Sequence, residues 1–406
     1  MLYKKEHTMI AIYILPIYVL ANFYVCQWFM KWLDAVLNGH LNMVARVIIW
    51  IVYWVLSLGM YITAAVPEGP IRKFFHVEGT YWYGIVLYVL LIIGICDIIR
   101  LIMRKSKKTP KDEPVLTRGK YIAIGAFCIA SILAVAIYGG IQARTIYNTS
   151  YEVNVDKSGN KIDNLNIVVV SDQHMGYSVG TAMMRDMVDK INAYHPDIVL
   201  MAGDIFDNNY DALEDPEELI KIYRSIESKY GVYAVYGNHD IDEEIIAGFT
   251  FPSEGKLTAD TRMNEFLEKA GVKNLRDEYV LIDDSFYVYG RPDYQKEGHG
   301  IEGRKSPEEV TSELDKNLPI IVIDHQPREL KELSNAGVDL DISGHTHDGQ
   351  IFPLNLTAKI MWENPCGLLK VGNMYSMVTS GVGFFGPGVR VGTEAEVVDL
   401  KVNFDK

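Results

Sequence analysis

The chain has 406 residues and a formal net charge of −13, but this charge is unevenly distributed. Residues 1–150 contain 15 Lys and Arg against 7 Asp and Glu, a net of +8, whereas the rest of the chain contains 24 against 45, a net of −21. The composition excludes a disordered chain and a collagen-like repeat, and it argues against a basic nucleic-acid-binding domain. The four cysteines provide neither a disulfide framework nor a Cys-type zinc site. The sequence therefore predicts a membrane anchor followed by an acidic globular domain.

Four apolar runs lie in the first part of the chain. They cover residues 9–30, 47–66, 81–99 and 121–139. Each is close to the roughly 20 residues that a helix needs to cross the hydrocarbon core of a bilayer. We therefore expect residues 1–140 to form a four-helix, multi-pass transmembrane region in contact with the lipid bilayer.

The basic residues indicate how this region is oriented. The segment 100–120, between the third and fourth runs, holds eight Lys and Arg, and two more after the first run make ten on one side against five on the other. Because Lys and Arg accumulate in cytoplasmic loops, this count predicts an extracytoplasmic acidic domain. Lys4 and Lys5 argue for the opposite orientation.

We expect residues 141–163 to form a polar connector that contains an edge strand. The domain over residues 164–406 alternates between short Val- and Ile-rich runs and longer helical patterns. This alternation is typical of an α/β domain. The short runs are almost continuously apolar, which indicates strands with both faces buried. We expect strands at 165–171, 197–202, 231–236, 319–324, 338–343 and 392–403, a hairpin at 278–291, and helices at 181–194 and 212–230.

Polar clusters follow five of these strands. They are Asp172-Gln173-His174, Gly203-Asp204-Ile205-Phe206-Asp207, Gly237-Asn238-His239-Asp240, His325, and Gly344-His345-Thr346-His347. Because strand ends meet at one edge of a sheet, these residues can come together in space. Carboxylates, imidazoles and an amide oxygen suit two neighbouring divalent cations. Each residue alone is more often a turn or loop residue than a ligand, but their shared position at five strand ends predicts a metal centre.

The order D-x-H, G-D-x-x-D, G-N-H-D, H and G-H-T-H resembles the motif set of the calcineurin-like metallophosphoesterase superfamily, and the resemblance covers about residues 164–402. With the apolar runs before it, the chain is similar to the membrane-anchored bacterial branch of that superfamily. The resemblance implies a four-layered α/β/β/α sandwich, attached to a bacterial cell membrane, with two divalent metal ions. Such ligands accept Mn, Fe, Zn or Co, so the sequence does not name the metals.

The resemblance also implies roles for the motif residues. It would place Asp172, His174 and His347 on one metal, Asn238, His325 and His345 on the other, and Asp204 as the bridge between them. His239 would contact the substrate phosphate and stabilise or protonate the leaving oxygen, and Asp207 would orient His239. The nucleophile would be a metal-bound hydroxide that attacks phosphorus in line.

Substrate contacts are less sharply indicated than metal ligands. Asp348, Gln350 and Arg390 are candidates, although a structural turn explains the Gly-rich segment around Arg390 nearly as well. The segments 246–262 and 291–306 have loop composition, and loops at the edge of a sheet commonly carry specificity. We therefore expect substrate choice to be decided there.

These observations predict a metal-dependent phosphoesterase that hydrolyses a phosphodiester or pyrophosphate bond of a membrane-associated substrate. A phosphorylated, lipid-linked compound is one such substrate. The alternatives are a phosphomonoesterase acting on soluble or protein substrates, and a non-catalytic membrane sensor. The acidic domain argues against nucleic acid as a partner, because a phosphate backbone requires basic contacts.

Overall fold

The structure, a computed structural model, describes residues 2–106, 110, 114–241, 245–246, 249–250, 260–295 and 303–405. Side chains are described from residue 15 onward in the first helix, and they are not described at residues 245–250. The chain divides into two compact units, one made mainly of residues before Gln142 and the other mainly of residues from Gln142 onward.

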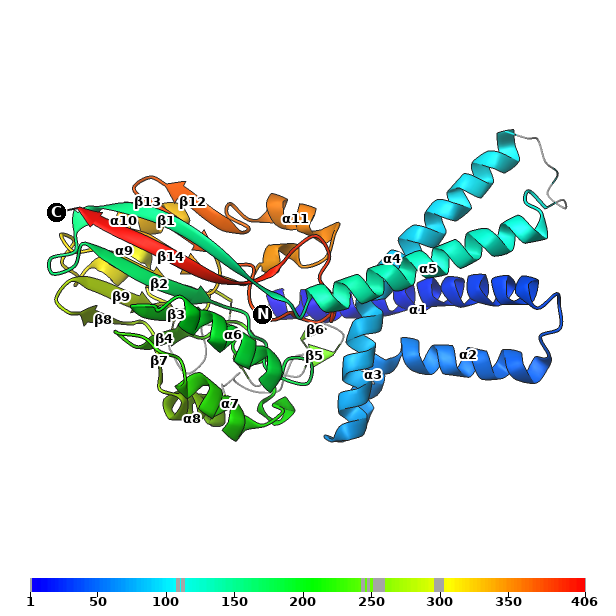
Figure 1. Cartoon of the computed structure of the whole chain (residues 1–406), viewed down its shortest axis with the longest axis horizontal. Helices are drawn as coiled ribbons and strands as arrows, with labels where there is room; N and C mark the ends of the chain where they lie inside the picture. Colours follow the sequence, from blue (N-terminus) through cyan, green and yellow to red (C-terminus); the bar gives the residue numbers. More distant parts are fainter. Residues whose placement is uncertain are drawn as a thin grey trace. The chain divides into compact units, whose positions relative to one another are not determined.

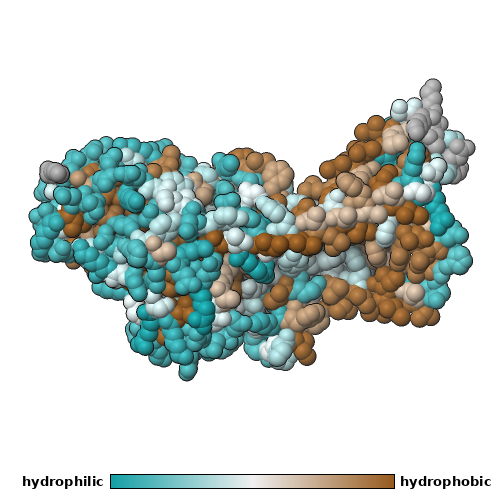
Figure 2. All heavy atoms as spheres, in the orientation of Figure 1, coloured by the Kyte–Doolittle hydropathy of each residue, from teal (hydrophilic) through white to brown (hydrophobic). Residues whose placement is uncertain are grey.

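The first unit consists mainly of helices, and Figure 2 shows hydrophobic residues gathered over them. Its elements are α1 Leu2–Val36, α2 Met43–Ser57, α3 Gly59–Ile62, η1 Thr63–Ala65, α4 Pro70–Ser106, α5 Arg118–Gln142, and the short strand pair β5 Ile245–Ile246 and β6 Phe249–Thr250. Within the described residues, α4 and α5 are each long and apolar enough to cross a membrane.

The prediction of four membrane spans is not confirmed. The third and fourth apolar runs lie in α4 and α5, but the second is broken, because the chain bends by 65° between α2 and α3. Gly79 of α4 lies so close to Met60 of α3 that an added Cβ would collide with the Met60 backbone, so the bent segment packs tightly on α4. The first run lies in α1, part of which is outside the described side chains. The described residues thus contain two membrane-length helices, or three if the bent pair forms one span.

Two six-stranded mixed sheets form the framework of the second unit (Figure 1). Their strand orders are β1-β14-β2-β3-β4-β7 and β12-β13-β11-β10-β9-β8. The strands β2, β3, β4 and β7 are mutually parallel, and so are β9, β10, β11 and β13. The bounds are β1 Ile146–Ser158, β2 Asn164–Val170, β3 Ile198–Ala202, β4 Val232–Val235, β7 Val272–Asn274, β8 Glu278–Ile282, β9 Phe286–Gly290, β10 Ile320–Ile323, β11 Leu340–Ser343, β12 Gly367–Val371, β13 Met374–Val378 and β14 Ala395–Asp405.

Helices cover the outer face of each sheet. They are α6 Thr181–Ala193, α7 Pro216–Arg224, α8 Thr261–Ala270, α9 Pro307–Thr311 and α10 Leu330–Ala336. The other helical elements of this unit are α11 Leu354–Met361 and the short turns η2 Tyr210–Ala212 and η3 His347–Gly349. Apolar side chains from α6, α7 and α8 pack on the first sheet, and those from α9 and α10 pack on the second.

A third apolar core lies between the two sheets. Val168 and Val170 of β2 contribute to the core under α6, whereas Ile167 and Val169 contribute to the core between the sheets. This alternation follows from the two-residue period of a strand and explains why the strand sequences are apolar throughout. The resulting order of layers is helix, sheet, sheet, helix, as the sequence predicted.

Most of the predicted strands are confirmed within two residues, among them the hairpin, which is β8 and β9, and the closing strand is β14, which begins three residues later than predicted. The predicted helix at 212–230 is shorter, because α7 begins after the N-cap Asp215 and ends at Arg224. The edge strand predicted in the connector at 141–163 is confirmed as the thirteen-residue β1, which lies at the edge of the first sheet and pairs in parallel with β14. The connector is therefore largely part of the first sheet.

Candidate metal centre

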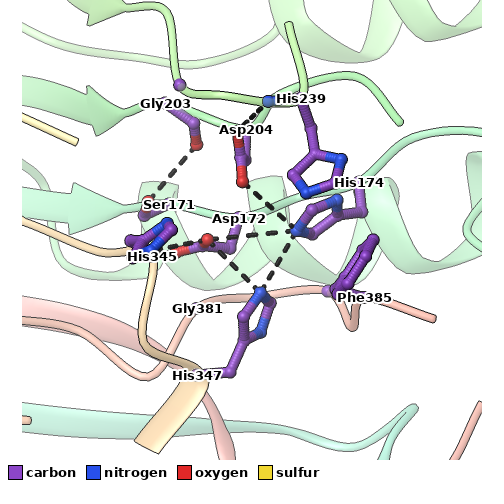
Figure 3. Close-up of polar contacts among 12 residues, drawn as sticks. Ser171, Asp172, His174, Gly203, Asp204, His239, His345, His347, Gly381 and Phe385 are labelled. Carbon is purple, nitrogen blue, oxygen red and sulfur yellow. Dashed lines mark hydrogen bonds and ion pairs between the residues drawn. The ribbon is translucent and has the colours of Figure 1, made fainter. Parts of the chain in front are cut away.

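The predicted ligands come together where parallel strands from both sheets end. Asp172 and His174 follow β2, Asp204 follows β3, and Asn238 follows β4, all in the first sheet. From the second sheet, His325 follows β10, and His345 and His347 follow β11. Figure 3 shows the side chains of Asp172, His174, Asp204, His345 and His347 pointing toward one another.

One group of donor atoms is formed by Asp172, His174 and His347. The Nε2 atoms of His174 and His347 lie 3.1 Å apart, and His347 Nε2 lies 3.3 Å from Asp172 Oδ1. The carboxylate of Asp204 is also near, because its Oδ2 atom lies 3.7 Å from His174 Nε2. This group matches the first of the two predicted ligand sets.

A second group surrounds His325. Its Nε2 atom lies 3.1 Å from each of Asp204 Oδ2, Asn238 Oδ1 and His345 Nδ1. Its Nδ1 atom lies 2.8 Å from the carbonyl oxygen of Ala202, which fixes the ring and directs Nε2 toward the other donors. Asp204 Oδ2 therefore takes part in both groups, which is the position expected of a bridging carboxylate.

The chemistry of these atoms fits divalent cations. Asp172, His174, Asp204 and His325 are each at most 2% exposed, and their nitrogen and oxygen atoms face one another. Burial raises the pKa of Asp172, because little solvent stabilises its charge. Clustered lone pairs and a buried carboxylate require a positive charge among them. The structure thus contains clusters of His and Asp side chains that are able to hold metal, as the sequence predicted.

The backbone is bent to bring these ligands inward. Asp172, His174, Asp204, His345 and His347 all have positive φ angles, between 46° and 71°. Non-glycine residues rarely adopt this conformation, which costs on the order of 1 kcal/mol or more at each site. Strain of this kind persists where the surrounding structure holds it and is concentrated at functional sites.

His239 lies beside the first group of ligands. Its backbone N–H donates to Asp204 Oδ1 at 2.7 Å, and its Nδ1 atom donates to the side-chain oxygen of Asn208. Its ring packs on Phe385, with the centroids 4.4 Å apart. Burial lowers the pKa of His239 to about 4. The ring is therefore neutral near pH 7, with Nε2 as the atom available for proton transfer.

The structure connects Asp207 with His239 less directly than the sequence predicted. Asp207 Oδ1 lies 3.9 Å from His239 Nδ1 but 3.5 Å from His174 Nδ1. Asn208 is the residue that hydrogen-bonds to His239. Asn208 lies one position beyond the G-D-x-x-D motif, and no sequence pattern distinguishes it from a turn asparagine, so its role could not be predicted.

The three candidate substrate contacts have different surroundings. Arg390 is fully buried, and its guanidinium donates to the carbonyl oxygens of Ser380 and Gly383 at 2.8 and 2.7 Å and lies against His347. It therefore supports a ligand-bearing loop, and the prediction that it contacts a phosphate does not fit this geometry.

Gln350 is also held by the protein itself. Its amide donates to the carbonyl oxygen of Phe385 at 3.1 Å and accepts from the Phe385 N–H at 3.0 Å. Gln350 thus positions the ring that covers His239, rather than presenting a free amide. Asp348 is half-buried, and burial raises its pKa. Most of segment 246–262 and residues 296–302 of segment 291–306 lie outside the described residues.

Comparison with known proteins gives the same interpretation of this domain. The chain is 27% identical over 333 residues to a zebrafish (Danio rerio) transmembrane protein with a metallophosphoesterase domain, covering 78% of this chain and 70% of that one. It is 29% identical over 260 residues to the bovine (Bos taurus) protein of the same description, of which it spans only 56%. It is 26% identical over 315 residues to an uncharacterized metallophosphoesterase of Campylobacter jejuni, covering 76% of this chain and 77% of that one.

Among solved structures, a 5'-nucleotidase precursor from Thermus thermophilus aligns with 59% of this chain and 55% of its own, at 16% identity and a TM-score of 0.37. The model of the calcineurin-like phosphoesterase family matches residues 165–349, which include every predicted metal ligand. The named transmembrane relatives and the helices α4 and α5 indicate association with a membrane. Residues 165–349 are therefore similar to the calcineurin-like phosphoesterase family, and the metallophosphoesterase relatives support metal-dependent phosphoester hydrolysis.

Proposed function

We propose that this protein hydrolyses a phosphodiester or pyrophosphate bond of a membrane-associated substrate with the aid of two divalent metal ions. The observation that carries the proposal is the position of Asp204. Its Oδ2 atom is shared by two buried donor groups, 3.1 Å from His325 and 3.7 Å from His174. A single carboxylate oxygen between two sets of ligands supports a pair of neighbouring ions rather than one.

The residues divide into those that hold the ions and those that act on the substrate. Asp172, His174 and His347 would hold one ion, Asn238, His325 and His345 the other, and Asp204 both. When bound, the ions would supply positive charge to the phosphoryl group and lower the pKa of a water molecule. The ligand shell keeps this charge in a largely buried site, where electrostatic interactions are strong.

His239 is the best-placed residue for proton transfer. Because Nδ1 donates to Asn208, Nε2 can take up a proton and return it to the oxygen that leaves phosphorus. The ring of Phe385 fixes the imidazole on one side, and Gln350 holds the Phe385 backbone. This arrangement supports a defined ring orientation before the substrate binds.

A membrane-associated substrate is supported by the surface near the ligands. The helix α11 begins five residues after Gly349, the last residue of η3, and its apolar side chains are unusually exposed. Ile360 is 85% exposed and Met361 74% exposed, and Figure 2 shows a hydrophobic cluster over this helix. Apolar patches on an otherwise acidic domain favour contact with lipid.

The charge of the loop between α4 and α5 supports an extracytoplasmic location for the domain. Segment 100–120 holds eight Lys and Arg, and such loops remain in the cytoplasm. If α5 crosses the membrane from that side, the chain emerges outside at Gln142. This arrangement corresponds to the membrane-anchored bacterial branch that the sequence resembles.

The proposal is tested with the purified full chain in detergent, loaded with Mn²⁺ or Zn²⁺. A panel of phosphomonoester, phosphodiester and pyrophosphate compounds is offered, both in solution and in lipid vesicles. We expect cleavage of a diester or pyrophosphate, with turnover reduced about 10²-fold in His239→Ala while bound metal is retained. Exclusive cleavage of monoesters would favour a phosphomonoesterase, and two bound metals without any cleavage would favour a sensor. Loss of metal in His239→Ala would refute its assigned role.

A further inference from the structure

A pocket of about 230 Å³ lies next to the metal centre and is not used by the proposed mechanism. It is lined by Tyr294, Pro327, Arg328, Glu329, Leu330, Met361, Trp362 and Glu363. Arg328 is three residues beyond the ligand His325, and Trp362 contacts the ligand His345, with ring centroids 5.3 Å apart. The pocket is therefore connected to the second ligand group through two of its lining residues.

Arg328 is held in a fixed orientation in this pocket. Its guanidinium carbon lies 4.5 Å from the ring centroid of Trp362 and 5.0 Å from that of Tyr294, within the range of cation–π attraction. Its Nε atom donates to Gln326 Oε1 at 3.1 Å. The Gln326 amide in turn donates to Asp293, at 2.8 and 2.9 Å from the two carboxylate oxygens. This chain of contacts limits the freedom of the long side chain before any ligand binds.

The two terminal amino groups of Arg328 remain available. No acceptor in the described part of the chain forms a hydrogen bond with them. The neighbouring arginines differ in this respect, because Arg291 and Arg304 both pair with Asp324 and Glu329. Glu329 has a φ of 56°, which turns its carboxylate toward those arginines although Arg328 is its neighbour in sequence.

A guanidinium whose plane is fixed and whose N–H groups are free is suited to bind an oxyanion. Its terminal amino groups can donate two parallel hydrogen bonds to a phosphoryl group, and the interaction is stronger than one between neutral partners. The Trp362 ring contacts both Arg328 and His345. An anion bound at Arg328 would therefore lie beside the second ligand group rather than within it.

We propose that Arg328, with Tyr294 and Trp362, forms a subsite for a second phosphoryl group, so that the preferred substrate is a diphosphate rather than a phosphodiester with a single phosphorus. This inference rests on the proposed function, because it names the class of substrate for the same metal centre. The pocket volume beyond Arg328, bordered by Leu330 and Met361, receives the group attached to the second phosphorus.

The kinetic test compares two substrates of the metal-loaded full chain. ADP-ribose carries two phosphoryl groups, and bis(p-nitrophenyl) phosphate carries one. We expect Arg328→Gln to lower kcat/KM for ADP-ribose about 10- to 100-fold more than for the diester, because a charged hydrogen-bond pair is lost only with the diphosphate. Arg328→Lys, which keeps the charge but not the planar fork, should give an intermediate loss.

Arg262→Gln is the matched control. Arg262 also lies over a tyrosine ring, Tyr210, at 4.7 Å, but its amino groups are occupied by Asp211 and Asp260. It should leave both kcat/KM values as in the wild type. If Arg328→Gln lowered kcat/KM equally for both substrates, or for neither, the proposed subsite would be refuted.

A binding experiment keeps this inference separable from the proposed function. Calorimetric titration of the Mn²⁺-loaded full chain with methylenediphosphonate and with methylphosphonate requires no turnover. Arg328→Gln should weaken the binding of methylenediphosphonate at least about tenfold more than the binding of methylphosphonate. If the wild type cleaves nothing but shows this difference, the proposed function fails and the subsite stands. If the wild type cleaves its substrates but both ligands lose affinity equally, the subsite fails alone.

Discussion

His174 Nε2 and His347 Nε2 lie 3.1 Å apart although 173 residues separate them in the chain. One follows a strand of the first sheet and the other a strand of the second, so the contact joins the two sheets at their carboxyl ends. Two buried imidazole nitrogens at this distance are held together best by a cation that both can coordinate. The metal centre is therefore expected to contribute to the stability of the domain as well as to its chemistry.

The bridging role of Asp204 predicts a joint loss of metal and activity. Asp204→Asn removes the negative charge shared by the two ligand groups, so bound metal should fall from two equivalents toward zero and turnover should vanish. Elemental analysis of the dialysed protein measures the first and substrate cleavage the second. Asp186→Asn, at an exposed Asp paired with Lys190, is the control. Retention of two metals in Asp204→Asn would exclude the bridge.

Asn208 is predicted to position His239 without touching the substrate. Asn208→Ala removes the acceptor for His239 Nδ1, so kcat should fall about tenfold while KM and metal content change little. Asn208→Asp, which keeps an acceptor oxygen, should restore most of the activity. The exposed Asn317 offers a control, Asn317→Ala. An unchanged kcat in Asn208→Ala would mean that Phe385 and the backbone suffice to hold the ring.

Asp341 predicts a pH dependence of stability. It is 1% exposed, and burial together with the neighbouring Asp324 raises its pKa to about 7. An acid whose folded pKa exceeds its unfolded value stabilises the fold fully below the unfolded pKa of 3.8, and this contribution is lost as pH rises toward 7. Asp341→Asn, which cannot ionise, should therefore gain stability over the wild type between about pH 4 and pH 7, on the order of a few kcal/mol.

The measurement for Asp341 is urea unfolding of the full chain in detergent at several pH values. The difference in the free energy of unfolding between Asp341→Asn and the wild type should grow from acid to neutral pH and remain constant above neutral pH. The hydrogen bonds from Ser343 and Ser376 to Asp341 Oδ2, at 3.3 and 3.2 Å, can also reach an asparagine oxygen. A difference that is the same at all pH values would show that Asp341 is ionised throughout.

The exposed face of α11 predicts a dependence on how the substrate is presented. Leu356→Ser combined with Ile360→Ser removes two side chains that are 51% and 85% exposed. Cleavage of a substrate in vesicles should fall about 30-fold or more, because burial of the two side chains in lipid is worth roughly 2 to 4 kcal/mol together. Cleavage of a soluble substrate should not fall. Leu281→Ser, at a 42% exposed residue of the edge strand β8, controls for the loss of an exposed leucine. Equal rates on vesicles would mean that α11 does not contact lipid.

The sequence could predict the metal site because its ligands follow strands that are recognisable by themselves. Asp172 and Asp204 each lie two residues after a run of apolar residues with both faces buried, and such runs have few alternatives to a central strand. The glycines that precede the ligands also indicated the site, because they allow close packing there. A Cβ at Gly344 would collide with the side chains of Ser171 and Asp172. Local pattern and tertiary position agree at these residues.

The parts that escaped prediction depend on contacts between distant segments. The sequence predicts an edge strand in the connector but not its partner, because Ile146 of β1 pairs with Ala395, at the far end of the domain. The break before Gly59 is equally hidden, because the apolar run continues through it and the close packing of Gly79 on Gly59 and Met60 joins segments distant in sequence. A buried arginine such as Arg390 has no local feature that distinguishes it from a surface cation.

The place of β14 in its sheet has a consequence for biosynthesis. This strand lies between β1 and β2, which the ribosome makes more than two hundred residues earlier. The first sheet cannot be completed until β14 has left the exit tunnel. The edges of β1 and β2 that pair with β14 therefore keep unpaired backbone N–H and C=O groups throughout most of translation. Chaperones that shield exposed strand edges are expected to be needed most during this interval, after the helices of the first unit have been synthesised.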